Sequence, residues 1–234
     1  MDCASALRLN VSNIKAYYRS ASALLGLSKF PEAVDAVNRG LTLDPTNASL
    51  KKLSSQISIR QAAAENLAAK RRSEEERKAK EALTLRAALS ARGIILKSSS
   101  DKDKAPDLQD AVIHLSPDPL SATSLLEFPA LFLYPLHAQS DFVKAFAEKD
   151  KIIDHLSYLI PLPWDTGGEY TVAGVECYMD APTGGMIKVG KKLSLLQVLA
   201  DGKTVVLDGM VKIYAVPAVR ASGWISEMKK RKGK

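Results

Sequence analysis

One long segment of this chain, from Ala48 to Arg92, contains neither glycine nor proline. It is rich in Ala, Leu, Glu, Lys and Arg, the residues with the highest intrinsic helix propensities. Acid–base pairs such as Glu74 and Lys78 stand four residues apart with the acid on the N-terminal side, which is the more stabilising orientation in a helix. The sequence therefore predicts a single long helix from about Ala48 to about Arg92.

An apolar stripe marks the first half of this predicted helix. Its members recur at three- and four-residue steps and are Leu50, Leu53, Ile57, Ala64 and Leu67. We expect this stripe to cap neighbouring helices. Charged residues dominate beyond Leu67, so we expect the second half to project into solvent. A coiled coil is the alternative, but the apolar seam is short and interrupted, which disfavours it.

The net charge of the chain is concentrated in the same segment. Residues 51–104 hold fourteen basic and seven acidic residues, and this surplus equals the net charge of +7 of the whole chain. Clustered cations attract phosphate, so binding of nucleic acid or a ribosome through the helix or the basic tail 228–234 is an open alternative. Acids are mixed into the run AKRRSEEERKAK, which favours a solvated spacer with ion pairs within the helix.

The residues before the long helix, 13–45, predict a helical hairpin. An apolar face recurs at helical spacing from Ile14 until Gly26 interrupts it. Pro31 suits the first turn of a second helix, where its missing N–H group costs nothing. Pro45 disfavours a helical conformation at the residue before it and ends that helix.

The order of small and large residues in this hairpin resembles a tetratricopeptide repeat, a helical hairpin of roughly 34 residues. The matching positions are Tyr17, Ala21, Leu24, Ala33, Gly40 and Pro45. Ala6, Leu7 and Leu9 match the tail of a preceding repeat, so the resemblance implies that the chain begins inside a repeat array. Such arrays need about three or more repeats for stability. We therefore expect an N-terminally truncated repeat domain or poorly supported N-terminal helices.

Short strands are expected after a polar segment without periodicity at 96–107. The runs with strand character are AVIHLS, ALFLYPL, GVECYMD, MIKVG, KTVVLDG and VKIYAVPAV. Asp-Gly dipeptides at 201–202 and 208–209 predict tight hairpin turns, and short connections favour an antiparallel sheet. Helices are expected over SDFVKAFAEKDKIIDHLSYLI, with Ser140 or Asp141 as N-cap, and over KLSLLQVLA.

This C-terminal part is similar to the wheel domain of the tetratricopeptide repeat protein 4 family, whose members are co-chaperones of the ninety-kilodalton heat-shock chaperone. The similarity covers about Glu127 to Lys229 and implies a twisted sheet with helices around it. The motifs that carry it are YP at 134–135, QSDF at 139–142, HL at 155–156, PWD at 163–165, EY at 169–170, ECY at 176–178, VGKKLSL at 189–195 and VVLDG at 205–209.

The expected fold is thus an α-helical tetratricopeptide repeat remnant plus a long charged helix, followed by an α+β wheel-like domain with a mainly antiparallel sheet. The predicted domains are the end of a repeat domain at 1–47, a capping and charged linker helix at 48–95, a polar linker at 96–107 and the wheel domain at 108–234.

Lys15 and Arg19 are the candidate peptide-binding residues. They stand four residues apart and therefore share one face of the first predicted helix. This spacing alone indicates only a solvated basic face. In the family, a carboxylate clamp grips the acidic C-terminal tail of the chaperone, and the resemblance places Lys15 and Arg19 at its last two basic positions. The remaining clamp residues have no counterpart here, so we expect weak or no tail binding by this chain alone.

The resemblance implies a co-chaperone adaptor that binds heat-shock protein 90, with heat-shock protein 70 as a second partner, and that assists the folding of client proteins. The competing interpretation is a nucleic-acid or ribosome-associated protein that acts through the basic helix and tail. No signal-peptide pattern and no apolar run of about 18 residues is present, so we expect no membrane contact and a location in the cytosol, with the nucleus as a second compartment.

No enzymatic activity is expected, because the three histidines, His114, His137 and His155, stand in no recognisable motif. Cys177 lies within a predicted strand and is expected to be a packed residue. No Cys/His spacing suits zinc, so neither a metal nor a cofactor is expected. Gly202 to Thr204 resembles the end of a phosphate-binding loop, but Gln197 occupies the position where that motif requires glycine.

Overall fold

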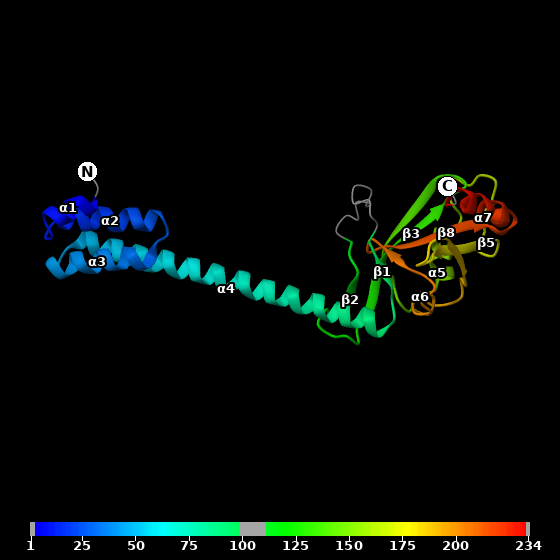
Figure 1. The fold of residues 1–234 in the computed structure, drawn as a ribbon, viewed down its shortest axis with the longest axis horizontal. Coiled ribbons are helices and arrows are strands. Elements are labelled where there is room, and N and C mark those ends of the chain that lie inside the picture. The colour runs from blue at the N-terminus through cyan, green and yellow to red at the C-terminus, as the bar shows by residue number, and fades with distance from the viewer. Residues whose placement is uncertain (1–2, 99–110, 233–234) are drawn as a thin grey trace. The chain divides into compact units, whose positions relative to one another are not determined.

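The computed structural model describes residues 3–98 and 111–232 (Figure 1). The chain divides into two compact units, which we call unit 1 (Met1–Lys78) and unit 2 (Ala79–Lys234). The division falls within the long helix α4 (Ala48–Ala91). Most of the predicted linker 96–107 lies outside the described residues. None of the helices in the described ranges combines the length and the apolar composition that a membrane span requires.

Unit 1 is helical and consists of α1 (Cys3–Leu9), α2 (Ile14–Gly26), α3 (Phe30–Leu43) and the first part of α4. The side chain of Asn13 caps α2 by accepting a hydrogen bond from the backbone N–H of Ala16 at 3.2 Å. A proline occupies the first turn of α3, as predicted. The predicted helical hairpin and the predicted long helix are both confirmed.

The core of unit 1 lies between α2, α3 and the start of α4. Its buried members are Ala21, Leu25, Ala33, Ala36, Val37, Leu50, Leu53 and Ile57. The predicted stripe on α4 is therefore confirmed as far as Ile57. Ala64 and Leu67 lie beyond the packed part of the hairpin and are exposed, so the prediction that they cover neighbouring helices is wrong.

Gly40 allows α3 to approach its neighbours closely. A Cβ atom at this position would lie 2.8 Å from Leu50 Cδ1 and 3.3 Å from Tyr17 Cβ, and both neighbouring side chains are buried. We expect Gly40→Val to lower the melting temperature of the helical signal through a stability loss of about 1–3 kcal/mol, because the core would be overpacked. Thermal unfolding followed by circular dichroism measures this loss.

The matched control for this substitution is Gly26→Val, since a Cβ at Gly26 meets no atom within 4 Å. Both substitutions add the same side chain to a helical glycine, so propensity effects are similar. If the two variants lose the same stability, close packing around Gly40 does not explain the loss in Gly40→Val.

Unit 2 is built around a sheet of six strands (Figure 1). The strands are β2 (His114–Ser116), β3 (Leu125–Tyr134), β4 (Gln139–Ala147), β5 (Val175–Asp180), β6 (Met186–Val189) and β8 (Val211–Pro217). They follow the order β2-β3-β8-β5-β6, and β4 pairs with β3. Among the described strand pairs of this sheet, only β3–β8 is parallel, so the prediction of a mainly antiparallel sheet is confirmed. A separate parallel pair joins β1 (Leu96–Lys97) and β7 (Val206–Leu207).

In the described part of unit 2, the sheet is accompanied by α5 (Ile152–Leu159), α6 (Leu195–Leu199) and α7 (Ala218–Lys232). The end of α4 also contributes to its core, because Ala88 and Leu89 are buried there. Residues 69–80 of α4 are exposed, as predicted for the second half of the helix. The same prediction is wrong for the last turns of α4, where burial depends on contacts with distant segments.

The helix predicted over 140–160 begins later than expected. Ser140 and Asp141 lie within β4, and α5 starts at Ile152 with Lys151 as its N-cap residue. Phe142 and Phe146 have the four-residue spacing of a helical face, but β4 pairs with β3 along nearly its whole length. The register shifts by one residue where β4 pairs with Phe128 and Ala130, so Phe142 and Phe146 lie on opposite faces of the sheet: Phe146 is buried and Phe142 is exposed.

Two further predictions near the C-terminus are corrected. The Asp208–Gly209 turn is confirmed, with positive φ angles of 54° and 75° and a bridge between Leu207 and Met210. The dipeptide at 201–202 follows α6 instead of joining two strands. The strand predicted over VKIYAVPAV ends at Pro217, where α7 begins, and α7 includes the first residues of the basic tail.

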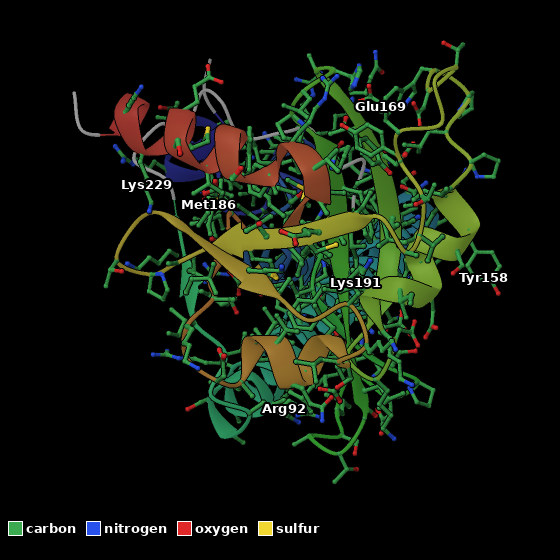
Figure 2. All side chains as sticks on the ribbon, turned by 90° about the vertical axis from the view of Figure 1, so that its right-hand side faces the viewer. Arg92, Tyr158, Glu169, Met186, Lys191 and Lys229 are labelled. Atoms are coloured by element: carbon green, nitrogen blue, oxygen red, sulfur yellow. The ribbon has the colours of Figure 1, made fainter. Side chains whose placement is uncertain are left out.

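Lys191 holds a loop of unit 2 in place (Figure 2). Its ammonium group donates hydrogen bonds to the carbonyl oxygens of Val172, Ala173 and Val175 at 2.6, 3.1 and 2.6 Å. We expect Lys191→Met to destabilise unit 2 by about 2–3 kcal/mol, because hydrogen bonds to charged donors are lost and carbonyl groups are left without partners.

Urea unfolding measures this effect, with Lys192→Met as the matched control. The side chain of Lys192 is exposed, and the substitution removes the same charge from the neighbouring position. If both variants lose the same stability, the three carbonyl contacts of Lys191 contribute nothing specific.

Candidate peptide-binding site

Lys15 and Arg19 lie on α2 and line one hollow of about 440 Å³ in unit 1. Both side chains are exposed, and neither forms an ion pair with a residue that the structure describes. The other residues that line the hollow are Ile14, Tyr18, Asn47 and Ser49. The structure therefore brings the two predicted cations together at one open groove.

The two cations are positioned by the packing of the residues between them. Ala16 and Tyr17 are buried, which directs the other face of this turn of α2 outward. Tyr17, one of the positions that match the repeat, is thus a core residue. Tyr18 lines the groove with 40% of its surface exposed.

The N-terminus of α4 forms the opposite wall of the groove, which the sequence did not predict. Asn47 accepts a hydrogen bond from the backbone N–H of Leu50 at 3.1 Å and donates to Asp44 at 3.1 Å, so its side chain fixes the helix start. Hydrogen bonds from Thr46 and Asn47 hold the pKa of Asp44 below its usual range. A helix N-terminus favours anions, so this wall adds to the attraction exerted by Lys15 and Arg19.

The motif residues of unit 2 have structural roles. Asp165 accepts hydrogen bonds from the backbone N–H groups of Glu169 and Tyr170 at 3.1 and 2.7 Å, which closes the loop around it. Trp164 packs edge-on against Tyr134 and Tyr170, each at 5.2 Å between ring centroids. Trp164 and Asp165 therefore form a structural anchor for this loop.

The histidines and Cys177 form no reactive cluster. His114, His137 and His155 each lie near one carboxylate, at separate places on unit 2. Within residues 3–98 and 111–232, no group of three His, Cys, Asp or Glu side chains could hold a metal ion. Cys177 is fully buried, and burial raises the pKa of its thiol to about 12. A thiol in this state is a poor nucleophile, so Cys177 is a packing residue as predicted.

A family profile described as the Cns1/TTC4 Wheel domain matches residues 118–228. The chain is 36% identical to the Hsp70/Hsp90 co-chaperone cns1 of Schizosaccharomyces pombe, over 99% of this chain and 64% of that protein. It is 32% identical to Tetratricopeptide repeat protein 4 of Homo sapiens, over 85% of this chain and 55% of that protein. The chain thus spans between about half and two thirds of the length of these relatives.

A solved structure of the Hsp90 co-chaperone Cns1 from Saccharomyces cerevisiae (delta69) has a similar fold. The TM-score is 0.86 at 30% identity, and the match covers 98% of this chain and 75% of that chain. Helices followed by a sheet-rich unit therefore occur in the same order in both proteins. The profile, the relatives and the shared fold together show that the chain belongs to the Cns1/TTC4 family.

Proposed function

We propose that this chain is part of a co-chaperone adaptor that binds heat-shock protein 90, with heat-shock protein 70 as a second partner, and assists the folding of client proteins. The observation that carries the proposal is the open groove that pairs Lys15 and Arg19, in a family whose relatives are named Hsp70/Hsp90 co-chaperones. The adaptor acts by binding and needs no covalent step. It works in the cytosol, with the nucleus as a second compartment.

The α2–α3 hairpin is, in this proposal, the last tetratricopeptide repeat of the domain, and α4 caps it. The close contact of Gly40 with Leu50 and Tyr17 supports this assignment, because repeats of this type need small residues where helices touch. We propose that the functional parts follow the ranges expected from the sequence. These ranges are 1–47, 48–95, 96–107 and 108–234.

The groove would bind the acidic C-terminal tail of the chaperone. Lys15 and Arg19 have no ion-pair partner among the described residues, so no internal contact has to break before a carboxylate binds. Ionised donors form short, strong hydrogen bonds with carboxylates. Unit 2 would contact the client or another part of the chaperone machinery.

The alternative of nucleic-acid binding through α4 stays a prediction. The exposed residues 69–80 of α4 include both acids and bases, which supports a solvated spacer more than a phosphate-binding surface. Cations interrupted by acids neutralise fewer phosphates, so the affinity gained from counterion release is smaller.

Titration of a labelled peptide that ends in Glu-Glu-Val-Asp tests the proposed function. We use this chain and a chimaera in which helical repeats of the Schizosaccharomyces pombe relative precede residue 1. The chimaera is expected to bind the peptide, and this chain is expected to bind it at least about tenfold more weakly, a difference of 1.4 kcal/mol, because it supplies part of the site. Absence of binding by the chimaera would contradict the proposed function.

A further inference from the structure

A second and larger hollow, of about 830 Å³, lies in unit 2 between the β5–β6 hairpin and α7. We call it the β6–α7 groove. Its side-chain walls are Met186 and Ile187 from β6 and Ile225, Met228 and Lys229 from α7. Figure 2 shows Met186 and Lys229 on the same side of unit 2. None of these residues belongs to the groove of Lys15 and Arg19.

The apolar wall on the helical side comes from the second half of α7. Its apolar stripe begins with Ala221 and Trp224, which are buried against Tyr178 and Val216. The next members of the stripe, Ile225 and Met228, are only partly buried and line the groove. Methionine is flexible and polarizable, so Met186 and Met228 can adapt to apolar side chains of different shapes.

An open strand edge borders the same groove. Among the described strands, β6 pairs with β5 and lies at the end of the sheet order. The other edge of β6 therefore presents backbone N–H and C=O groups that an extended segment can pair with. The loop that leads into β6 is open as well, because a Cβ at Gly184 or Gly185 would meet no atom within 4 Å.

Cations dominate the rim of the β6–α7 groove. Lys229 lines the groove, and Lys230, the next residue of α7, is exposed. Lys188 on β6 is largely exposed, although it pairs with Glu176 at 2.5 Å. An apolar wall with a basic rim is complementary to a segment that combines apolar and acidic side chains.

We propose that the β6–α7 groove binds an extended acidic segment of a partner protein. The segment pairs with the free edge of β6 and inserts its apolar side chains between Met186, Ile225 and Met228. Its acidic side chains face Lys229 and Lys230. The groove would be the site where unit 2 contacts a client or another partner, and the acidic apolar segment would be what it binds. In that respect the inference rests on the proposed function.

Fluorescence anisotropy with the full chain tests this proposal. The probe is a short labelled peptide that alternates Glu with Leu and Phe, and the comparison peptides replace Glu with Lys or the apolar residues with Ser. The acidic apolar peptide is expected to bind, and each comparison peptide is expected to bind at least about tenfold more weakly. Equal binding of all three peptides, or no binding of the first, would overturn the proposal.

Charge reversal on the rim separates the groove from general attraction to a basic protein. Lys229→Glu with Lys230→Glu is expected to weaken binding about tenfold. The matched control, Lys144→Glu with Lys149→Glu, makes the same charge change at exposed positions on and just after β4 and is expected to leave binding unchanged. Equal losses in the two double variants would overturn the proposal.

Amide chemical shifts supply a test that needs no variant. Addition of the acidic apolar peptide is expected to shift signals of residues 184–189 and 225–229, and shifts confined to α2 would contradict the proposal. Lys15→Ala with Arg19→Ala is expected to leave this binding intact. If the chimaera fails to bind the chaperone-tail peptide while the acidic apolar peptide still binds unit 2, only the proposed clamp is contradicted. If the chimaera binds the tail peptide while the acidic apolar peptide does not bind, only the β6–α7 groove is contradicted.

Discussion

Replacement of Arg92 or Glu148 by alanine is expected to lower the free energy of unfolding of unit 2 by about 3–5 kcal/mol. Arg92 Nε lies 2.6 Å from Glu148 Oε2, and Arg92 Nη2 donates to Glu148 Oε1 at 3.0 Å. The Glu148 side chain is 3% exposed and that of Arg92 is 16% exposed. Loss of one partner leaves the other charge in a poorly solvated place, which costs more than the pair itself contributes.

The guanidinium group of Arg92 also connects the end of α4 to the segment before β3. It donates hydrogen bonds to the carbonyl oxygens of Ala122 and Ser124 at 3.2 and 2.8 Å. The backbone carbonyl of Glu148 accepts from the N–H of Leu196 at 2.8 Å, so α6 is attached at the same place. The ion pair therefore lies where four segments distant in sequence meet.

Urea unfolding followed by tryptophan fluorescence measures the effect, because both tryptophans, Trp164 and Trp224, belong to unit 2. The double variant Arg92→Met with Glu148→Leu is expected to lose less stability than either alanine variant, since it leaves no unpaired charge. A loss below about 1 kcal/mol in both single variants, the range of exposed ion pairs, would contradict this account of the pair.

Charge reversal of Lys15 and Arg19 to glutamate is expected to weaken binding of the chaperone-tail peptide to the chimaera at least about a hundredfold. Hydrogen bonds to charged groups contribute about 1.5–3 kcal/mol each, and two such contacts would be replaced by repulsion. The same peptide titration measures the affinity. The proposed binding of the chaperone tail requires that both Lys15 and Arg19 face the carboxylates of the bound peptide.

The matched control for this reversal is Lys52→Glu with Arg60→Glu. Both residues are exposed cations of unit 1 and do not line the groove of Lys15 and Arg19. The control is expected to change the affinity less than about threefold, through long-range attraction that salt screens. A similar loss in both double variants would mean that net charge, and not the groove, drives binding.

The helices of unit 1 and the length of α4 could be predicted because their signals are local. Proline and glycine mark the ends of α2 and α3, and α4 runs for 44 residues without either. The burial of Ala88 and Leu89 could not be predicted, since it depends on strands far away in the chain. Arg92 and Glu148 are likewise 56 residues apart, and no local pattern connects them.

The strand β4 shows how a local pattern can mislead. Phe142 and Phe146 indicate a helical face, but pairing with β3 decides the conformation. At the candidate site, the spacing of Lys15 and Arg19 predicted their shared face, and the resemblance suggested what they bind. The wall made by Asn47 and Ser49 was missed, because it depends on how the start of α4 packs beside α2.

Binding of intact heat-shock protein 90 to the chimaera, measured by calorimetry, decides whether this family member acts as the proposed adaptor. The comparison is the same chaperone without its C-terminal Glu-Glu-Val-Asp residues. We expect the intact chaperone to bind and the shortened one to bind about a hundredfold more weakly, a difference of about 2.7 kcal/mol. Equal affinity for both forms, or no binding of the intact chaperone, would contradict the proposed function.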